Sequence, residues 1–280
     1  MFQTEREAKH ILIAKQNGEM RLTEHLSINA GSRNFVLLKM KAKSHSLAKD
    51  LITIVYQISV TTKNGDESMN IIKIIKGSDI KIIKEVPGLK VNFLGDNSIL
   101  ELHEPVPKFY NSEIAFGSHS FCRIGGSQYK IKNLKISRIK DRSKVTIGKN
   151  FSCEEVTIPM HGETGLSVTI GDECMFSHGI TISPSDFHAI ISLETGEPLN
   201  FGADITIGNH VWIAPRCTIL KGTSISDDSV VASHSLVNKS FEEKNVLIGG
   251  APAKILKRAI TWSRDNCQWV MKKRKVENGQ

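Results

Sequence analysis

Residues 207–237 read IGNHVWIAPRCTILKGTSISDDSVVASHSLV, and every sixth residue of this stretch is aliphatic. The aliphatic positions are Ile207, Ile213, Ile219, Ile225, Val231 and Val237. Neither the helical period of about 3.6 residues nor the strand period of about 2 residues explains a repeat of six by itself. Turn-forming residues such as Gly208, Pro215 and Gly222 recur about as often as the aliphatic ones. The repeating unit is therefore a very short strand followed by a corner.

A chain that turns a corner every six residues coils into a prism and points one aliphatic side chain per face into its interior. The fourth residue after each aliphatic position is small or medium-sized, which suits the corners of a narrow core. These corner residues are Val211, Cys217, Thr223, Ser229 and Ser235. The period continues upstream at Ile170, Phe176 and Ile182. The pattern predicts an all-β fold, a parallel β-helix that runs from about residue 80 to about residue 249.

Three segments depart from the repeat. Residues 1–79 predict a small α+β or β appendage, with a short helix that ends at Gly18 and strands in DLITIVYQISV and SMNIIKIIKG around the hairpin signal Asn64-Gly65. Residues 184–204, PSDFHAIISLETGEPLNFGAD, form a long insertion that predicts a functional loop, and PMHGETGLS at 159–167 predicts a small corner loop. Residues 250–280 predict a turn, a helix that caps the open end of the coil, and a basic tail.

The net charge of +8, from 37 Lys and Arg against 29 Asp and Glu, predicts an anionic partner or an ordinary solvated basic face. The sequence shows no nucleic-acid-binding motif. It has no apolar signal region and no run long enough to span a membrane, so a cytoplasmic location is expected. The five cysteines form no CxxC pair, which argues against a disulfide framework or a zinc knuckle. Cys153, Cys174 and Cys217 fall in the hexapeptide frame and are predicted as small core residues.

Five motifs carry a resemblance to a known family. They are SDFHAI (185–190), TGEPLN (195–200), IGNHVWI (207–213), ILKG (219–222) and GGAPAK (249–254). The hexapeptide frame resembles the left-handed β-helix acyltransferases, and the motifs together resemble the bacterial O-acetyltransferases that modify capsular polysaccharide and polysialic acid. The resemblance covers roughly residues 90–262, and Ala251 stands where the family turn frequently has Asn. It implies a left-handed coil, against the usual right-handed crossover, with acetyl-CoA as co-substrate, no metal, and a homotrimer.

The resemblance implies that His188, in the long insertion, is the general base. An acceptor hydroxyl is a poor nucleophile until a base removes its proton, and a neutral imidazole does this near neutral pH. Because the thioester is already activated, the hydroxyl attacks it directly, and backbone N–H groups stabilise the oxyanion. Asp186 either orients the imidazole or caps a turn, since residues 186 and 188 of an extended segment point the same way. Asn200 either binds acceptor hydroxyls or only forms a turn.

Trp212 precedes an inward aliphatic residue, so it points outward and must cover something. Similar enzymes place this residue against the acyl-CoA or the acceptor, and subunit packing is the alternative. The coenzyme is expected along the coil downstream of the loop, where backbone amides near Ala214, Ala232 and Ser233 bind the pantetheine. Phosphate contacts are expected from basic side chains near the GGAPAK turn. The residues assigned to this end of the coenzyme are Lys239, Pro252, Lys254 and Arg258.

Two other functions remain open at this point. Carbonic anhydrases of the hexapeptide class bind zinc through three histidines, but the histidines of this part of the chain give no pair five residues apart. A glycan-binding scaffold without catalysis would leave His188 idle. The favoured hypothesis is a cytoplasmic O-acetyltransferase that acts on a sugar hydroxyl of a capsular or other surface polysaccharide, most simply an anionic one. An amino-sugar or small-molecule acceptor, and a peripheral association with the capsule export machinery, are further possibilities.

Overall fold

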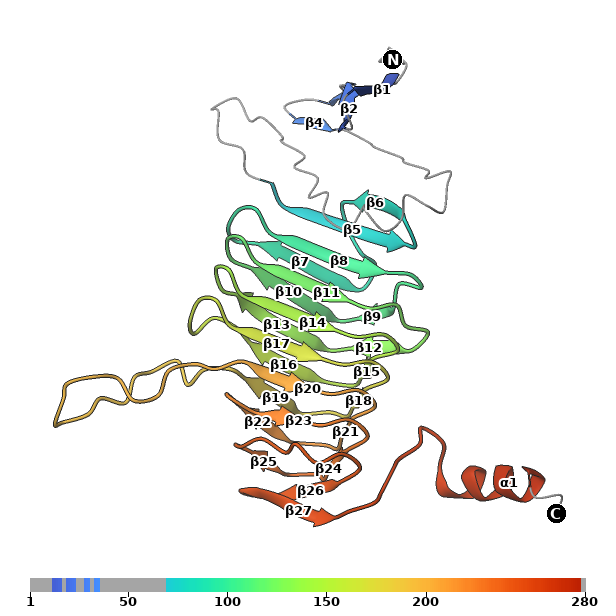
Figure 1. Cartoon of the computed structure of the whole chain (residues 1–280), viewed down its shortest axis with the longest axis vertical. Coiled ribbons are helices and arrows are strands. Elements are labelled where there is room, and N and C mark those ends of the chain that lie inside the picture. Colours follow the sequence, from blue (N-terminus) through green and yellow to red (C-terminus); the bar gives the residue numbers. More distant parts are fainter. Residues whose placement is uncertain (1–11, 17–18, 24–27, 31–32, 36–68, 278–280) are drawn as a thin grey trace.

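The computed structural model describes residues 12–16, 19–23, 28–30, 33–35 and 69–277. From residue 69 onward the chain winds into a three-sided coil of short strands, shown in Figure 1. Successive strands take successive faces, so each face consists of every third strand. Neighbouring strands within a face are parallel, except for the antiparallel pairs β5–β6 and β26–β27 at the two ends. The prediction of an all-β parallel β-helix is confirmed.

The strands are grouped by face as follows. Face 1 contains β5 (Ile71–Lys76), β6 (Asp79–Ile83), β8 (Ile99–His103), β11 (Phe121–Ile124), β14 (Lys144–Ile147), β17 (Ser167–Ile170), β20 (Ile205–Ile207) and β23 (Ser224–Ile225). Face 2 contains β9 (Lys108–Tyr110), β12 (Lys130–Lys132), β15 (Ser152–Cys153), β18 (Met175–Phe176), β21 (Trp212–Ile213), β24 (Val230–Val231), β26 (Leu247–Gly250) and β27 (Ala253–Lys257). Face 3 contains β7 (Leu89–Phe93), β10 (Ser112–Phe116), β13 (Leu134–Ile139), β16 (Val156–Pro159), β19 (Ile180–Ser183), β22 (Thr218–Leu220) and β25 (Leu236–Val237).

The core is a set of stacked side chains, one layer per turn of the coil. On face 1, Ile147, Ile170, Ile207 and Ile225 are paired in register from strand to strand, and each is at most 1% exposed. Each side chain of this kind contributes about 1.5–3 kcal/mol when it is fully buried. The six aliphatic positions of residues 207–237 and the five predicted corner residues are all buried, as are Cys153, Cys174 and Cys217. The hexapeptide interpretation of the core is therefore confirmed.

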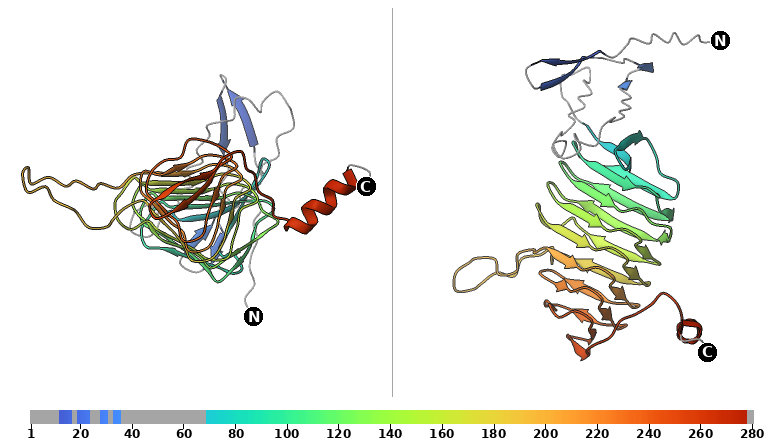
Figure 2. Two further views of the ribbon diagram at one scale, coloured as in Figure 1. Left: turned by 90° about the horizontal axis from the view of Figure 1, so that it is seen from below. Right: turned by 45° about the vertical axis from the view of Figure 1, so that its right-hand side comes forward.

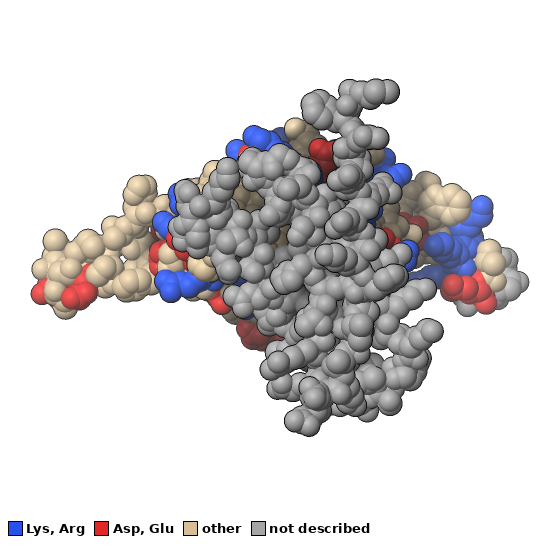
Figure 3. Space-filling view, turned by 90° about the horizontal axis from the view of Figure 1, so that it is seen from above, with Lys and Arg blue, Asp and Glu red and all other residues tan. Residues whose placement is uncertain are grey.

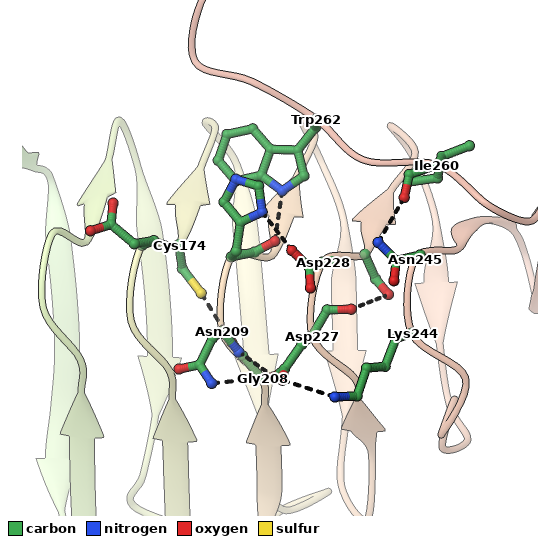
Figure 4. Close-up of polar contacts among 12 residues, drawn as sticks. Cys174, Gly208, Asn209, Asp227, Asp228, Lys244, Asn245, Ile260 and Trp262 are labelled. Atoms are coloured by element: carbon green, nitrogen blue, oxygen red, sulfur yellow. Dashed lines mark hydrogen bonds and ion pairs between the residues drawn. The ribbon is translucent and has the colours of Figure 1, made fainter.

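Gly171 ends the segment V-T-I-G at 168–171 and lies where consecutive turns approach closely, at the corner between faces 1 and 2. A Cβ atom on Gly171 would lie 2.6 Å from the backbone of Gly208 and 2.7 Å from the side chain of Asn209. Side-chain oxygens also link consecutive corners by hydrogen bonds. The side chain of Asn209 accepts from the Asp172 amide, and that of Asp227 accepts from the Asn209 amide. These contacts, part of which Figure 4 shows, hold successive turns in one register.

The amino-terminal prediction needs a correction. The segment predicted as a short helix ending at Gly18 contains the strand β1 (Leu12–Gln16), which pairs antiparallel with β2 (Glu19–Thr23). Asn17-Gly18, between these two strands, is the kind of dipeptide that favours a hairpin. A second antiparallel pair joins β3 (Ile28–Ala30) to β4 (Arg33–Phe35). DLITIVYQISV and Asn64-Gly65 lie outside the described residues, and β5, which starts at Ile71, joins the coil upstream of the boundary expected near residue 80.

The carboxy-terminal end also differs from the prediction. The predicted helix is present as α1 (Cys267–Glu277), but none of its residues is buried, and it stands away from the coil in Figures 1 and 2. The last turn of the coil is followed by the hairpin β26–β27, which extends face 2 at this end instead. α1 carries four consecutive cations, Lys272 to Lys275, which favour solvent over a core. In the described part of the chain, no helix has the length and apolarity of a membrane span.

A charged cluster on the outside of face 1 joins three strands near the start of the coil. The buried Glu101 carboxylate bonds Lys73 Nζ at 2.8 Å, Arg123 Nε at 2.6 Å and His103 Nε2 at 2.8 Å. Burial alone raises the pKa of the Glu101 carboxyl, but hydrogen bonds from Lys73, His103 and Arg123 outweigh burial and lower the pKa to about 2. The carboxylate is therefore held charged by the strands on either side of β8.

We expect Glu101→Gln to lower the free energy of unfolding by about 1–3 kcal/mol at pH 7, since two cations lose their shared partner. A lowered pKa in the folded state stabilises above the unfolded value near 4.5 and loses that stabilisation as pH falls toward about 2. Urea unfolding at fixed protein concentration should therefore show wild type losing more stability than the variant between these pH values. Glu104→Gln, which removes an exposed partner of Lys76, is the control. Equal pH dependence in wild type and Glu101→Gln would contradict the assignment.

Candidate active site

The long insertion, residues 184–204, leaves the coil at the corner between faces 3 and 1, where it connects β19 to β20. It projects well beyond the prism as two adjacent legs, seen on the left of Figure 1. The legs are joined by an antiparallel bridge between Ile191 and Pro198 and by a backbone hydrogen bond of 2.8 Å from Leu199 N to Ile190 O. This segment, called the active-site loop below, is therefore a narrow hairpin-like arm.

His188 lies on the first leg of the active-site loop, and its side chain is exposed. Its backbone oxygen accepts a hydrogen bond of 2.9 Å from the side-chain amide of Asn200 on the second leg. Within residues 69–277, the structure records no hydrogen bond or ion pair to the His188 imidazole. The backbone of His188 is therefore fixed while both ring nitrogens remain free to contact a substrate, as a general base requires.

Asp186 has other partners than the predicted one. Its carboxylate oxygen Oδ2 accepts from Lys221 Nζ at 2.5 Å and from Asn200 Nδ2 at 2.8 Å. The hydrogen bond from Lys221, followed by that from Asn200, lowers the pKa of the Asp186 carboxyl. The expectation that Asp186 orients the imidazole of His188 is wrong for this structure. The carboxylate instead binds Lys221, a cation on the neighbouring turn of the coil.

Asn200 braces the active-site loop. Its amide nitrogen donates to Asp186 Oδ2 and to His188 O, while its amide oxygen accepts from the Ile190 amide at 2.7 Å. Both N–H groups are used, which leaves one lone pair of the oxygen for a further donor. The predicted role of Asn200 in binding acceptor hydroxyls is therefore reduced to that lone pair, and its main contacts hold the two legs together.

Residues from the small corner loop predicted at 159–167 also contact the active-site loop. Glu163 Oε1 accepts from Ser185 Oγ at 3.0 Å and from the Gly202 amide at 2.7 Å. The ring of His161 stacks on that of Phe187, with centroids 4.6 Å apart and planes 12° apart. Neither Glu163 nor Lys221 was singled out from the sequence, although both stand in the quoted segments PMHGETGLS and ILKG.

Trp212 lies on the outer side of face 2, as predicted, next to Met175 on one side and Val230 on the other. In a three-sided prism the corner between faces 3 and 1 is opposite face 2, so Trp212 and His188 of one chain lie on opposite sides of the coil. Trp212 is partly covered by Trp262, whose ring centroid is 6.1 Å away. The indole N–H of Trp212 is buried and has no partner among the described residues.

The segment 258–266, called the strap below, runs from the last hairpin back over the corner of faces 1 and 2. Trp262, labelled in Figure 4, stacks on His210 with ring centroids 4.3 Å apart and donates from Nε1 to the His210 backbone oxygen at 2.6 Å. The Arg264 guanidinium bonds Ser152 Oγ at 2.7 Å and the Asn150 backbone oxygen at 2.9 Å. The strap therefore joins turns of the coil far apart in sequence, and the sequence patterns did not reveal it.

No family model matches the chain. The chain is 34% identical over 225 residues to the polysialic acid O-acetyltransferase of Neisseria meningitidis, and the alignment covers 79% of this chain and 91% of that protein. The chain belongs to the polysialic acid O-acetyltransferase family. The polysialic acid O-acetyltransferase of Escherichia coli O1:K1 is 32% identical over 146 residues, which cover 52% of this chain and 44% of that protein. Among solved structures, the polySia specific acetyltransferase NeuO gives a TM-score of 0.56 at 29% identity, over 64% of this chain and 74% of that one.

Membership of this acetyltransferase family confirms the left-handed β-helix class and the resemblance stated from the motifs. The chain is an O-acetyltransferase of the hexapeptide family. The scaffold hypothesis without catalysis is therefore not supported. Among the described residues, no three or more His, Cys, Asp or Glu side chains lie together so that they could hold a metal ion, such as the zinc of a three-histidine site.

Two of the backbone amides predicted to bind the coenzyme already donate hydrogen bonds within the coil. The amide of Ala214 donates to Val231 O at 2.9 Å and that of Ala232 donates to Ile248 O at 2.8 Å. These two N–H groups are therefore unavailable to a pantetheine chain, which corrects the prediction for them. The exposed Ser233 follows Ala232, and its amide has no recorded hydrogen bond in the described part of the chain. Ser233 thus remains the candidate backbone donor.

The predicted phosphate contacts lie around the last turn of the coil. Lys254 on β27 and Pro252 in the preceding turn are exposed. Arg258 pairs with Glu243, with Nε 3.0 Å from Oε1, and Lys239 Nζ lies 5.6 Å from the ring centroid of Phe241. Lys254 has no recorded partner within the described residues, so its charge is available to a phosphate. Arg258 already has a carboxylate partner.

Proposed function

We propose that this acetyltransferase transfers the acetyl group of acetyl-CoA to a hydroxyl group of an anionic surface polysaccharide, with His188 as the general base. The observation that carries the proposal is the free, exposed imidazole of His188 on a loop whose backbone is fixed by Asn200. The acceptor class follows from the relatives, which are named for polysialic acid, an anionic polymer. The net charge of +8 agrees with that class.

The reaction needs one proton acceptor and one leaving group. His188 accepts the hydroxyl proton while the sugar oxygen attacks the thioester carbon. The tetrahedral intermediate collapses with cleavage of the carbon–sulfur bond, and the proton passes from the imidazolium to the departing sulfur. The products are an O-acetyl ester and coenzyme A, so atoms and charge balance without a covalent enzyme intermediate.

The proposed site lies between two chains of a homotrimer. His188 and Trp212 of one chain face opposite sides of the prism, so they meet only if the corner of one chain packs against face 2 of the next. Repeating such a head-to-tail contact closes a ring. The active-site loop carries large exposed apolar side chains, which mark a contact surface. They are Phe187, Ile190, Ile191, Leu193, Leu199 and Phe201, the least exposed at 40%.

The distribution of charged side chains differs between the two sides of the molecule. In Figure 3 the active-site loop, on the left, is tan with acidic residues at its tip and carries no Lys or Arg, whereas Lys and Arg gather at α1 on the right. The row next to Trp212 on face 2, formed by Met175, Val230 and Leu247, is apolar. Val230 is already buried in the single chain, and an apolar loop of the neighbouring chain would cover the parts of Met175, Trp212 and Leu247 that are still exposed. Binding of acetyl-CoA beside Ser233 and Lys254, the cytoplasmic location and the association with export machinery stay predictions.

The proposed function predicts thiol release from acetyl-CoA that depends on a polymeric acceptor. We expect turnover with anionic capsular polysaccharides and little with neutral ones. The rate at subsaturating acceptor should fall as salt rises, because screening shortens the range over which the basic protein attracts a polyanion. Free thiol is measured against a panel of both kinds of polymer, and the product ester is identified by its alkali lability. Equal, salt-insensitive turnover on a neutral polymer would remove the charge argument, and no turnover with any acceptor would contradict the transferase itself.

A further inference from the structure

We propose that Glu163 and Lys221 are positioning residues for the reaction, and that each one ties both legs of the active-site loop to a neighbouring turn of the coil. Glu163 belongs to the corner loop one turn before the insertion, and Lys221 belongs to the corner one turn after it. The inference rests on the proposed function, because the group that they position is His188. It adds two residues that act through the loop and do not touch the reacting atoms.

The first clamp is the carboxylate of Glu163. A single oxygen, Oε1, accepts from Ser185 Oγ on the outgoing leg and from the Gly202 amide on the returning leg. A glycine is needed at position 202 for this close approach, since a Cβ atom there would lie 2.9 Å from that same oxygen and 2.8 Å from a methyl group of Leu166. Ser185 then uses its oxygen to accept from the Phe187 amide at 3.2 Å, which brings the fixed backbone to the residue before His188.

The second clamp is the ammonium group of Lys221. It donates to Asp186 Oδ2 on the outgoing leg and to the Asn200 backbone oxygen on the returning leg at 2.6 Å. Asn200 closes the group by donating to both Asp186 and the His188 backbone oxygen. The Lys221 side chain is only 21% exposed, although Asp186 is 40% exposed, so the cation lies under the loop and not in solvent. This geometry assigns Lys221 to the loop, not to general surface charge.

The two clamps act at the base of an arm whose outer part has few contacts with the coil. On the tip side of Asn200, the recorded bonds of residues 190–199 stay within the arm, as for Ser192 N to Glu197 O at 2.9 Å and Glu194 N to Ser192 Oγ at 3.2 Å. The orientation of the arm relative to the prism is therefore set at its base by Glu163 and Lys221, with the His161–Phe187 stack beside them. A small rotation at the base moves His188 away from a substrate held by the coil, and a displacement of about 1 Å can cost about 100-fold in rate.

The test compares Lys221→Met and Glu163→Gln with wild type, with Lys221→Arg as the conservative variant. Lys132→Met is the matched control, because it also removes a lysine that pairs with a carboxylate, Glu154, at 2.9 Å on the coil. We expect kcat to fall by about 10–100-fold in Lys221→Met and Glu163→Gln. The KM for acetyl-CoA and the unfolding midpoint should change little, Lys221→Arg should recover most of the rate, and Lys132→Met should behave as wild type.

Hydrogen exchange provides a readout that does not depend on activity. In Lys221→Met and Glu163→Gln, amides of the active-site loop such as Ile190 and Gly202 should exchange faster, while amides of the coil strands keep their protection. Unchanged loop exchange, or unchanged kcat in both variants, would overturn the inference. A fall in kcat matched by an equal loss of protection throughout the coil would also overturn it, since the residues would then be merely structural. Absence of turnover in wild type would contradict the proposed function. Hydrogen exchange would then still test whether Glu163 and Lys221 hold the active-site loop.

Discussion

His188→Ala should lower acceptor-dependent release of thiol from acetyl-CoA by about 100- to 10,000-fold, the range that a positioned general base contributes. The expectation follows from the free imidazole: the ring has no recorded partner in the described part of the chain, so its removal leaves no buried group unsatisfied. The coil should therefore fold as before, and the loss should appear in kcat more than in the KM for acetyl-CoA. His188→Gln should be equally impaired, because an amide side chain keeps hydrogen-bonding capacity but cannot accept the proton.

The measurement is steady-state thiol release at saturating acetyl-CoA with the best acceptor from the polysaccharide panel. His119→Asn is the matched control, since His119 is an exposed corner histidine with a positive φ of 54°, a conformation that Asn tolerates. The control should keep wild-type turnover. If His188→Ala retains most of its activity, the base lies elsewhere, and His161→Ala becomes the next variant because that ring stacks on Phe187.

The core could be predicted from the sequence because it depends on one local rule applied many times. An inward position of a hexapeptide coil meets the same environment in every turn, so Ile207, Ile213 and Ile225 carry the same information and confirm one another. The corner glycines Gly148 and Gly171 follow the same logic, since the nearest atom of the next corner would lie 2.4 Å and 2.6 Å, respectively, from a Cβ atom placed on them. Periodic burial is thus visible in a single sequence without knowledge of any long-range contact.

The support of the active-site loop could not be predicted in this way, because it depends on contacts between turns. Asp186 and Lys221 are 35 residues apart, and they meet because they follow β19 and β22, which are neighbouring strands of face 3. Local reasoning paired Asp186 with His188 on the basis of strand alternation, whereas the nearby cation competes more strongly for a carboxylate than a neutral imidazole does. A residue's immediate neighbours in sequence therefore gave the wrong partner.

The arrangement of α1 and the strap also could not be predicted from sequence patterns, for a different reason. The apolar residues of α1 suggested a cap, but the run from Lys272 to Lys275 places charge around most of the helix circumference. The contact of Trp262 with His210 spans 52 residues and depends on the path of the strap, for which no periodic signal exists.

The burial of Glu101 likewise depends on contacts between turns, because its register partners on β5 and β11 are Lys73 and Arg123.

Mixing two inactive variants should restore activity if the active site is shared between chains. We expect Trp212→Ala to lower turnover at least about tenfold, because in the proposed trimer this residue lines the side of the site that the neighbouring chain supplies. A chain with His188→Ala keeps Trp212, and a chain with Trp212→Ala keeps His188. In a ring of three chains, mixed at equal amounts and assembled at random, about a quarter of the sites then receive both intact residues. The mixture should recover about a quarter of wild-type turnover.

The recovery distinguishes a shared site from one built within a single chain, since a single-chain site stays inactive in every mixture. The two variants are unfolded and refolded together, or expressed together, and turnover is measured per mole of sites. A mixture of His188→Ala with His188→Gln is the control and should stay inactive. Full activity of Trp212→Ala alone would remove that residue from the site. Recovery no greater than the residual activities of the two variants would contradict a site shared between His188 of one chain and Trp212 of another.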